Sequence, residues 1–347
     1  MVFSLVGLIV GVAIAGGIIG LCWPGWGILP RWRHATRIAE RVRIEDTLKH
    51  LYESEVNGVV PGVQSVAGAV RLSVDEVTEV LQGLQLRRLI AIEMDGIHLT
   101  ASGRDLGLHM LRAHRLWESY LADHTGFPEI EWHSRAHDLE HGLSPVEVDA
   151  LSARLQHPIR DPHGDPIPTA EGEFSGQRGV PLPSAALDQP LRILHMEDEP
   201  KAVYAQLVAQ GLHPGSPVRL LEVSPHRVRL AAGGAEHALD PLAAASISVT
   251  PLEQGKRAEE PVGEPLSSLR PGEEGRVLSI SRRCRGPERR RFMDLGVLPG
   301  TVIQAEMRSP NGDPTAYRIR DALIALRAEQ AEVIRVERLP RPRAAVA

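Results

Sequence analysis

The residues best suited to chemistry lie in two short stretches rich in histidine and glutamate. The first is HRLWE, from His114 to Glu118, and the second is HSRAHDLEH, from His133 to His141. On a helix, residues four apart share a face, so each stretch would present imidazole and carboxylate groups together. These donors suit Mn(II), Fe(II), Co(II) or Zn(II), and the absence of thiolates disfavours a structural zinc site. The pattern therefore predicts a divalent-metal site; the alternative is a surface helix whose histidines are solvated.

The rest of the 347-residue chain shows no pattern that is typical of an enzyme. We find no nucleophile elbow, phosphate loop or spaced acid pair, so a metal-dependent hydrolase is disfavoured. The only cysteines, Cys22 and Cys284, give no disulfide framework, which agrees with a reducing compartment. A formal net charge of −5 gives no general argument for a nucleic-acid partner.

An apolar segment precedes the first charged side chain, Arg31. The run from Val2 to Trp23 is long enough, at ~1.5 Å per residue, to cross a ~30 Å hydrocarbon core. A cleaved signal peptide is disfavoured because only Met1 precedes this run. We therefore expect a transmembrane anchor (1–30), a basic juxtamembrane segment (31–43), and a single-pass cell-membrane protein whose soluble part is cytoplasmic. The arginines that would hold that part inside are Arg31, Arg33, Arg37, Arg41 and Arg43.

Residues 44–103 have the pattern of a winged helix-turn-helix. Helices are expected at EDTLKHLYESE, at Val63–Val70 and from Val74 to about Leu86. The pair Asp95-Gly96 between two alternating strands predicts a β-hairpin, the wing. The third helix would be the recognition helix, whose N-terminal residues enter the major groove of DNA.

The recognition helix is acidic at the end that would meet DNA. Ser73 and Glu76 have the spacing of a capping box. Asp75, Glu76 and Glu79 repel a polyanion, although one glutamate can accept a hydrogen bond from cytosine N4. The alternative is that Asp75 and Glu76 only favour the helix N-terminus, in a module with lost or weakened DNA binding. The expected DNA-binding side chains are Arg71, Ser73, Glu76, Glu79, Arg87 and Arg88.

Three further segments complete the predicted organisation. Residues 104–169 are helical up to about Arg154, and the prolines of PIRDPHGDPIP then prevent a helix. Two β-rich segments, 187–252 and 264–337, look like a divergent repeat, because QGLHPGSPV and LGVLPGTVI place Gly215 and Gly300 in register. The predicted fold class is a multidomain α+β chain.

The segment from about Ile44 to Thr169 resembles the diphtheria-toxin-repressor family of iron- and manganese-dependent regulators. The resemblance is carried by RAHRLWESYL, by the EH of DLEH followed by LS, and by HPIRDPHGDPIP. It implies binding of Fe(II) or Mn(II), dimerisation through an all-α domain, and repression of metal-uptake genes. It also implies an ancillary metal site at His114, Glu118 and His133, and a primary site at Asp46, His137, Glu140 and His141.

The sequence departs from the family pattern at two positions. His137 stands where iron-type members have Cys and manganese-type members a carboxylate, which leaves the metal's identity open. Lys49 stands where the manganese type has a further Glu, which puts a binuclear site in doubt. Asp46 would come from the DNA-binding module and the other primary ligands from the dimerisation helices. Binding of metal would thus hold one against the other and select the DNA-binding pose.

The C-terminal segments resemble small β-barrels. Residues 265–336 resemble the FeoA domain, a Src-homology-3-like barrel, through LSSLRPGEEGRVLSI and RRRFMDLGVLPGTVI. The earlier segment resembles the barrel that ends the repressors, which can supply an acidic ligand to the ancillary site. Here that ligand would be Glu197 or Glu199, or both are ordinary surface acids. Barrels of this type look like protein-interaction modules.

Two functions remain open. The first is a membrane-anchored, Fe(II)- or Mn(II)-dependent transcriptional regulator that binds DNA as a homodimer. The second is a metal-sensing accessory subunit of a metal-ion transporter, with weak or no DNA binding and a metal-transport permease as its partner. The single span and the acidic recognition helix favour the second function, whereas the winged helix, the metal ligands and the barrel order favour the first.

Overall fold

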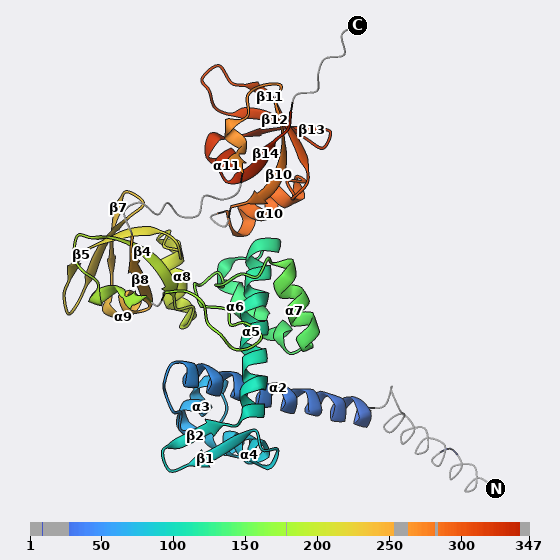
Figure 1. The fold of residues 1–347 in the computed structure, drawn as a ribbon, viewed down its shortest axis with the longest axis vertical. Coiled ribbons are helices and arrows are strands. Elements are labelled where there is room, and N and C mark those ends of the chain that lie inside the picture. Colours follow the sequence, from blue (N-terminus) through green and yellow to red (C-terminus); the bar gives the residue numbers. More distant parts are fainter. Residues whose placement is uncertain (1–8, 10–27, 178, 253–262, 282–283, 341–347) are drawn as a thin grey trace. The chain divides into compact units, whose positions relative to one another are not determined.

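The computed structural model describes residues 9, 28–177, 179–252, 263–281 and 284–340 of this multidomain α+β chain (Figure 1). Contacts divide the chain into two compact units. Unit 1 comprises Met1–Ala113 with His141–Pro145, and unit 2 comprises His114–Glu140 with Val146–Ala347.

Unit 1 has the predicted order of helix, helix, helix and hairpin. Its elements are α2 (Ile28–Val56), α3 (Val63–Val70), α4 (Val74–Leu86), β1 (Ile90–Glu93), β2 (Gly96–Leu99) and the start of α5 (Ala101–His124). The bounds of α3 and α4 confirm the prediction, whereas α2 begins well before the expected first helix. Apolar side chains at helical spacing fill the core; those buried include Leu48, Leu51, Val66, Val77, Leu81 and Leu84.

The hairpin is confirmed, but its turn lies one residue earlier than the sequence suggested. Glu93 pairs with Gly96, so Met94 and Asp95 are the two unpaired residues. Gly96 has a φ of 146°, and a Cβ there would lie 2.5 Å from Cγ1 of Val60. The glycine is therefore required where the start of β2 packs against the α2–α3 connection rather than at the centre of the turn.

The predicted membrane span is not confirmed. Apart from Ile9, the residues of that span lie outside the described part of the chain. Among the described residues, no helix combines the length and the apolar composition needed to cross a bilayer. The longest, α2, carries charged residues at intervals from Arg31 to Glu55. The predicted single-pass localisation in the cell membrane is contradicted by this finding.

Unit 2 begins with helices and a proline-rich turn. The rest of α5 is followed by the 3-10 helix η1 (Glu129–Glu131), α6 (Trp132–Glu140) and α7 (Pro145–Arg154). The turn at 158–168 is shaped by Asp161, whose Oδ1 accepts hydrogen bonds from three successive backbone N–H groups at 2.9 Å. Gly164 has a φ of 98°, and a Cβ there would lie 2.0 Å from the carbonyl oxygen of Leu194. The turn therefore packs closely on the strand that contains Leu194.

Two six-stranded antiparallel sheets complete unit 2. In the first, with strand order β3-β8-β4-β5-β6-β7, the elements are β3 (Val180–Pro181), η2 (Leu182–Ser184), β4 (Pro190–Met196), α8 (Lys201–Ala209), β5 (Pro217–Val223), β6 (Val228–Ala232), β7 (Ala235–Leu239), α9 (Pro241–Ala245) and β8 (Ile247–Pro251). In the second, with order β9-β14-β10-β11-β12-β13, they are β9 (Glu264–Pro265), η3 (Leu266–Ser268), β10 (Glu274–Ile280), α10 (Gly286–Asp294), β11 (Val302–Arg308), β12 (Thr315–Ile319), β13 (Ala322–Leu326), α11 (Ala328–Glu332) and β14 (Ile334–Arg338).

The two sheets share one topology, which confirms the predicted repeat. Each strand and helix of the first sheet has a counterpart at the same place in the strand and element order of the second. Even the irregularities correspond: the register shift after Ile193 matches the one after Val277, and the shift after Leu220 matches the one after Ala305. Each sheet closes over its own cluster of buried apolar side chains.

Substitution of Gly103 tests the packing of α5 on the hairpin of unit 1. A Cβ at Gly103 would lie 1.9 Å from the carbonyl oxygen of Leu89. Because backbone cannot move aside cheaply, we expect Gly103→Ala to lower the free energy of unfolding by about 1–3 kcal/mol. Gly68→Ala in α3 is the control: no atom lies within 4 Å of its Cβ, so a gain of up to ~1 kcal/mol is expected. Equal urea midpoints for the two variants would contradict this packing.

Candidate metal centre

Three of the predicted ligands meet inside unit 2. His114 and Glu118 lie one turn apart on α5, and His133 lies in the first turn of α6. Nε2 of His114 is 3.0 Å from Oε1 of Glu118 and 3.2 Å from Nδ1 of His133. The same Nδ1 is 3.2 Å from Oε1 of Glu118. Two nitrogens and one carboxylate oxygen therefore converge, as the predicted ancillary site requires; we name these residues the α5–α6 cluster.

The α5–α6 cluster is buried and charged. Glu118 is only 2% exposed, and an isolated carboxylate at such a site would be very costly. Burial raises the pKa of Glu118, but the charges of His114 and His163 outweigh burial and hold it well below its usual range. Burial lowers the pKa of His133, but hydrogen bonds to Asp198 and Glu118 raise it to about 10. Without metal, protons on the histidines balance the buried carboxylate.

Two residues outside the predicted ligand set face the same carboxylate. His163 comes from the 158–168 turn, and its Nδ1 is 3.5 Å from Oε2 of Glu118. Asp198 comes from the loop between β4 and α8, and its Oδ2 is 2.7 Å from Nδ1 of His133 and 3.8 Å from Nδ1 of His163. Glu118, His163 and Asp198 have one donor atom each within 4.8 Å of one another. They form a second candidate ligand group, which shares Glu118 with the first.

The sequence contained only a partial signal for these two residues. His163 lies within HPIRDPHGDPIP, whose prolines predict a turn and whose pattern carries the family resemblance, but neither feature singles out its histidine. Asp198 stands between Glu197 and Glu199, the two acids that the resemblance suggested. Both glutamates are exposed, whereas Asp198 is half-buried against His133. The acid in contact with the cluster is therefore the middle one of three.

The predicted primary ligands His137 and Glu140 also contact each other in unit 2. Glu140 is fully buried in the last turn of α6, and its Oε1 is 3.2 Å from Nδ1 of His137. Its other oxygen, Oε2, is 2.5 Å from Nδ1 of His114. His114 thus faces Glu140 through one ring nitrogen and the α5–α6 cluster through the other. This single imidazole connects the two predicted ligand sets.

The other two primary ligands, Asp46 and His141, lie in unit 1. Nε2 of His141 is 3.5 Å from Oδ1 of Asp46, and its Nδ1 is 2.7 Å from Oε2 of Glu45. Arg41 contacts Glu45 at 2.6 Å and donates to the carbonyl oxygen of His141 at 3.1 Å. A carboxylate on one ring nitrogen fixes which nitrogen of a histidine remains available for metal. Sequence reasoning did not single out Glu45, although it adjoins Asp46.

The predicted DNA-binding residues lie around α4 in unit 1. The capping box is confirmed: Ser73 Oγ accepts from the backbone N–H of Glu76 at 3.3 Å, and Glu76 Oε2 accepts from the backbone N–H of Ser73 at 3.0 Å. Arg71, the C-cap of α3, has a φ of 54°, and Arg87 is the C-cap of α4. The predicted side chains that are exposed on this part of unit 1 are Arg71, Ser73, Glu79, Arg87 and Arg88.

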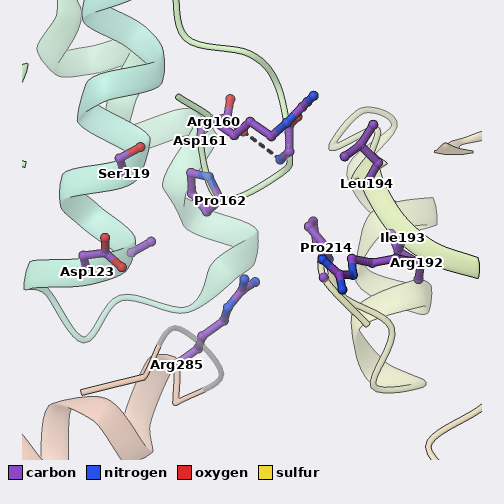
Figure 2. A pocket seen from close by; sticks show the side chains of 13 residues that line it. Ser119, Asp123, Arg160, Asp161, Pro162, Arg192, Ile193, Leu194, Pro214 and Arg285 are labelled. Atoms are coloured by element: carbon purple, nitrogen blue, oxygen red, sulfur yellow. Dashed lines mark hydrogen bonds between the residues drawn. The ribbon is translucent and has the colours of Figure 1, made fainter. Parts of the chain in front are cut away.

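A cavity of about 230 Å³ lies elsewhere in unit 2 (Figure 2). Its lining includes Ser119 and Asp123 of α5, Arg160 and Pro162 of the turn, and Arg192 of β4. Arg160 is already engaged, because it donates to the carbonyl oxygen of Gly164 at 2.5 Å. The predicted metal ligands are not among the 13 lining residues. The cavity is therefore not the candidate metal centre.

The donor set fits a divalent transition metal. Imidazole nitrogens and carboxylate oxygens converge at a buried point in unit 2, without any thiolate. The one cysteine in the described residues, Cys284, is buried in the core of the second sheet. Such nitrogen and oxygen ligands suit manganese, iron and zinc. The residues present therefore meet the chemical requirement of the predicted ancillary site.

Substitution of Asp198 tests its place in the ligand set. We expect Asp198→Ala to weaken Mn(II) binding by at least the 10- to 100-fold that loss of an outer-shell partner costs. Glu199→Ala removes the next acid of the same loop, which is exposed, and should change affinity little. Calorimetric titration of both variants makes the comparison, and equal affinities would exclude Asp198 as a ligand.

Metal binding should release protons. The pKa of His133 and of His163 is raised to about 10, so both are protonated at pH 7.5 without metal, and a ligating nitrogen must lose its proton. We expect release of about one to two protons per ion and an affinity that rises with pH up to about 10. Calorimetry in two buffers of different ionisation enthalpy measures the release, and His133→Ala should release about one proton fewer. A value near zero for the unmodified chain would contradict this assignment.

Two protein families match defined parts of the chain. Residues 100–169 match the family model described as the metal binding and dimerisation domain of iron-dependent repressors. Residues 264–338 match the FeoA domain.

Individual relatives point to the same families. The iron-dependent repressor IdeR of Mycobacterium tuberculosis is 32% identical over 122 residues, which are 35% of this chain and 53% of that protein. The diphtheria toxin repressor of Corynebacterium glutamicum is 30% identical over 145 residues, covering 39% and 64%. A probable metal transport system membrane protein of Chlamydia trachomatis is 43% identical over 78 residues, covering 22% and 17%. The chain thus spans about half the length of the first relative.

These relatives are named as regulators or as a transport-system protein, in agreement with the prediction that the chain is not an enzyme.

Solved structures extend the likeness to the fold. A manganese-dependent transcriptional repressor in complex with manganese has a TM-score of 0.55 at 27% identity, covering 60% of this chain and all of that one. The structure of ScaR with bound Zn²⁺ has a TM-score of 0.52 at 28% identity, covering 60% and 99%. Sequence and fold therefore agree that this chain carries the metal-binding and dimerisation domain of the diphtheria-toxin-repressor family of iron-dependent repressors, together with a FeoA domain.

Proposed function

We propose that the chain is an Fe(II)- or Mn(II)-dependent transcriptional regulator that binds DNA as a homodimer through the winged helix-turn-helix of residues 44–103. The observation that carries this proposal is the buried α5–α6 cluster. A carboxylate at 2% exposure between two imidazoles brings metal-ligating donors together at a buried point, where only a bound cation or protons on the histidines can balance its charge. The relatives named as metal-dependent repressors support the same function.

The proposed ligands fall into two sets. The ancillary set is His114, Glu118 and His133, to which the contacts described above add His163 and Asp198. The primary set is Asp46, His137, Glu140 and His141, as the family resemblance implies, with Glu45 orienting His141. His and carboxylate donors without thiolate suit Mn(II) and Fe(II), and the bound ion would supply a positive charge that replaces the protons on these histidines.

The remaining segments receive structural and interaction roles. We propose residues 104–169 as the helical dimerisation domain, and 187–252 and 264–337 as two Src-homology-3-like barrels of the FeoA type. Their shared strand order and matching irregularities support a common origin for the two barrels. A protein-interaction role suits them because their buried clusters are apolar, apart from the hydroxyls of Tyr204 and Tyr317 and the thiol of Cys284, whose pKa burial raises to about 12.

A second candidate function is a metal-sensing regulatory part of a metal-ion transporter. The similarity to the chlamydial protein named as part of a metal transport system favours it, although that similarity covers 22% of this chain. Both candidates use the same metal centre. They differ in whether metal controls binding to DNA or to a permease.

Metal-dependent DNA binding distinguishes the two candidates. The full chain with Mn(II) should bind DNA from upstream of its own gene and should lose that binding in chelator. The double variant His137→Ala with His141→Ala should lose the metal response, because half of the proposed primary set is removed. His226→Ala is the matched control, since this histidine is exposed in a strand connection of the first sheet. A folded chain that shows no metal-dependent binding at low salt would exclude the regulator and leave the transporter function.

A further inference from the structure

The N-terminal half of α2 extends beyond the core of unit 1. Leu48 and Leu51 in the C-terminal half are 0% and 2% exposed, whereas every residue from 35 to 41 is exposed. At ~1.5 Å per residue the segment Ile28–Arg43 is about 24 Å long, roughly two thirds of the ~34 Å turn of DNA. We name this segment the basic arm.

The composition of the basic arm is one-sided. Its sequence contains five arginines and one acid, Glu40. Arg31 and Arg37 are exposed, and neither forms an ion pair with a residue in the described part of the chain. Glu40 is neutralised by Arg87 at 3.0 Å. The positive charge of Arg31 and Arg37 is therefore not compensated by an acid among the described residues.

Two ion pairs place the arm beside α4. Arg43 lies 3.5 Å from Glu76 in the first turn of α4, and Glu40 lies 3.0 Å from Arg87 at its C-terminal end. Both pairs are exposed, with side chains 44–62% accessible, so each contributes little to stability and can be exchanged for another partner. The arm thus adjoins the helix that is proposed to enter the major groove.

The acidic recognition helix lacks the charge that DNA binding needs. Asp75 and Glu79 are exposed on α4 and repel phosphates. Proteins hold their position on DNA mainly through phosphate contacts from arginine and lysine, while base contacts determine the sequence. Cations on a neighbouring helix would supply the missing attraction without altering the residues that face the bases.

We propose that the basic arm, through Arg31, Arg37 and Arg43, binds the DNA phosphate backbone next to the site of α4. This inference rests on the proposed DNA-binding function and deepens it. The arm's contribution is independent of sequence and depends on salt, because each phosphate contact releases a condensed counterion.

The test compares the full chain, loaded with Mn(II), with the double variant Arg31→Ala with Arg37→Ala. Binding is measured to its own upstream DNA and to an unrelated 30-base-pair duplex between 50 and 200 mM salt. The variant loses two contacts per protomer and four per proposed homodimer, which should reduce the slope of log K against log salt by about 3.6. Between 50 and 200 mM salt, its affinity should therefore fall by a factor about 150 times smaller than that of the unmodified chain. The loss at low salt should be equal for both duplexes.

The matched control is Arg219→Ala with Arg276→Ala, which removes two exposed arginines from the sheets of unit 2. It should leave the salt slope unchanged. If the arm variant binds DNA in a metal-dependent way with the same salt slope as the unmodified chain, the proposed phosphate contacts of the basic arm are wrong. The proposed function would then remain intact. No DNA binding by the unmodified chain would overturn both. Loss of binding to vesicles containing 30% phosphatidylserine, with DNA binding unchanged, would assign the arm to a lipid surface instead.

Discussion

Burial of the Glu118 carboxylate is the constraint on which unit 2 depends. A carboxylate that is 2% exposed must be surrounded by cationic or hydrogen-bonding groups, and no single element of the fold provides enough of them. His114 comes from the same helix, His133 from α6 and His163 from the proline-rich turn, while Asp198 of the loop after β4 pairs with His133. Two helices, a turn and a sheet must therefore be packed together before the site exists.

Local features of the turn make this convergence possible. Asp161 satisfies three backbone N–H groups, which fixes the conformation of the turn, and Gly164 permits contact with the carbonyl oxygen of Leu194. His163 lies between these two residues. Its ring contacts Tyr204 edge-on at 5.1 Å, so apolar packing on one side directs its Nδ1 toward Glu118. The prolines and glycine of this stretch thus act on the site through backbone geometry.

The sequence predicted what local signals determine and missed what packing determines. The bounds of α3 and α4, the capping box at Ser73 and the repeated sheet all follow from periodicity, spacing or self-similarity within short windows. The roles of His163 and Asp198 depend on contacts between segments far apart in the chain. Which of three consecutive acids faces His133 is set by the path of a loop, and a loop has no periodicity from which to infer it.

The arginines after the apolar segment show how one pattern supports different physical interpretations. Positive charge beside an apolar run indicated a membrane boundary, but in the structure Arg37 and Arg43 belong to the same continuous helix as the core residue Leu48. The interpretation of the acids of α4 as a source of repulsion toward DNA also changes. Glu76 caps its helix and pairs with Arg43, so its charge is partly used within unit 1. The negative charge that remains exposed on α4 is therefore smaller than the sequence suggests, and the positive charge of α2 lies beside it.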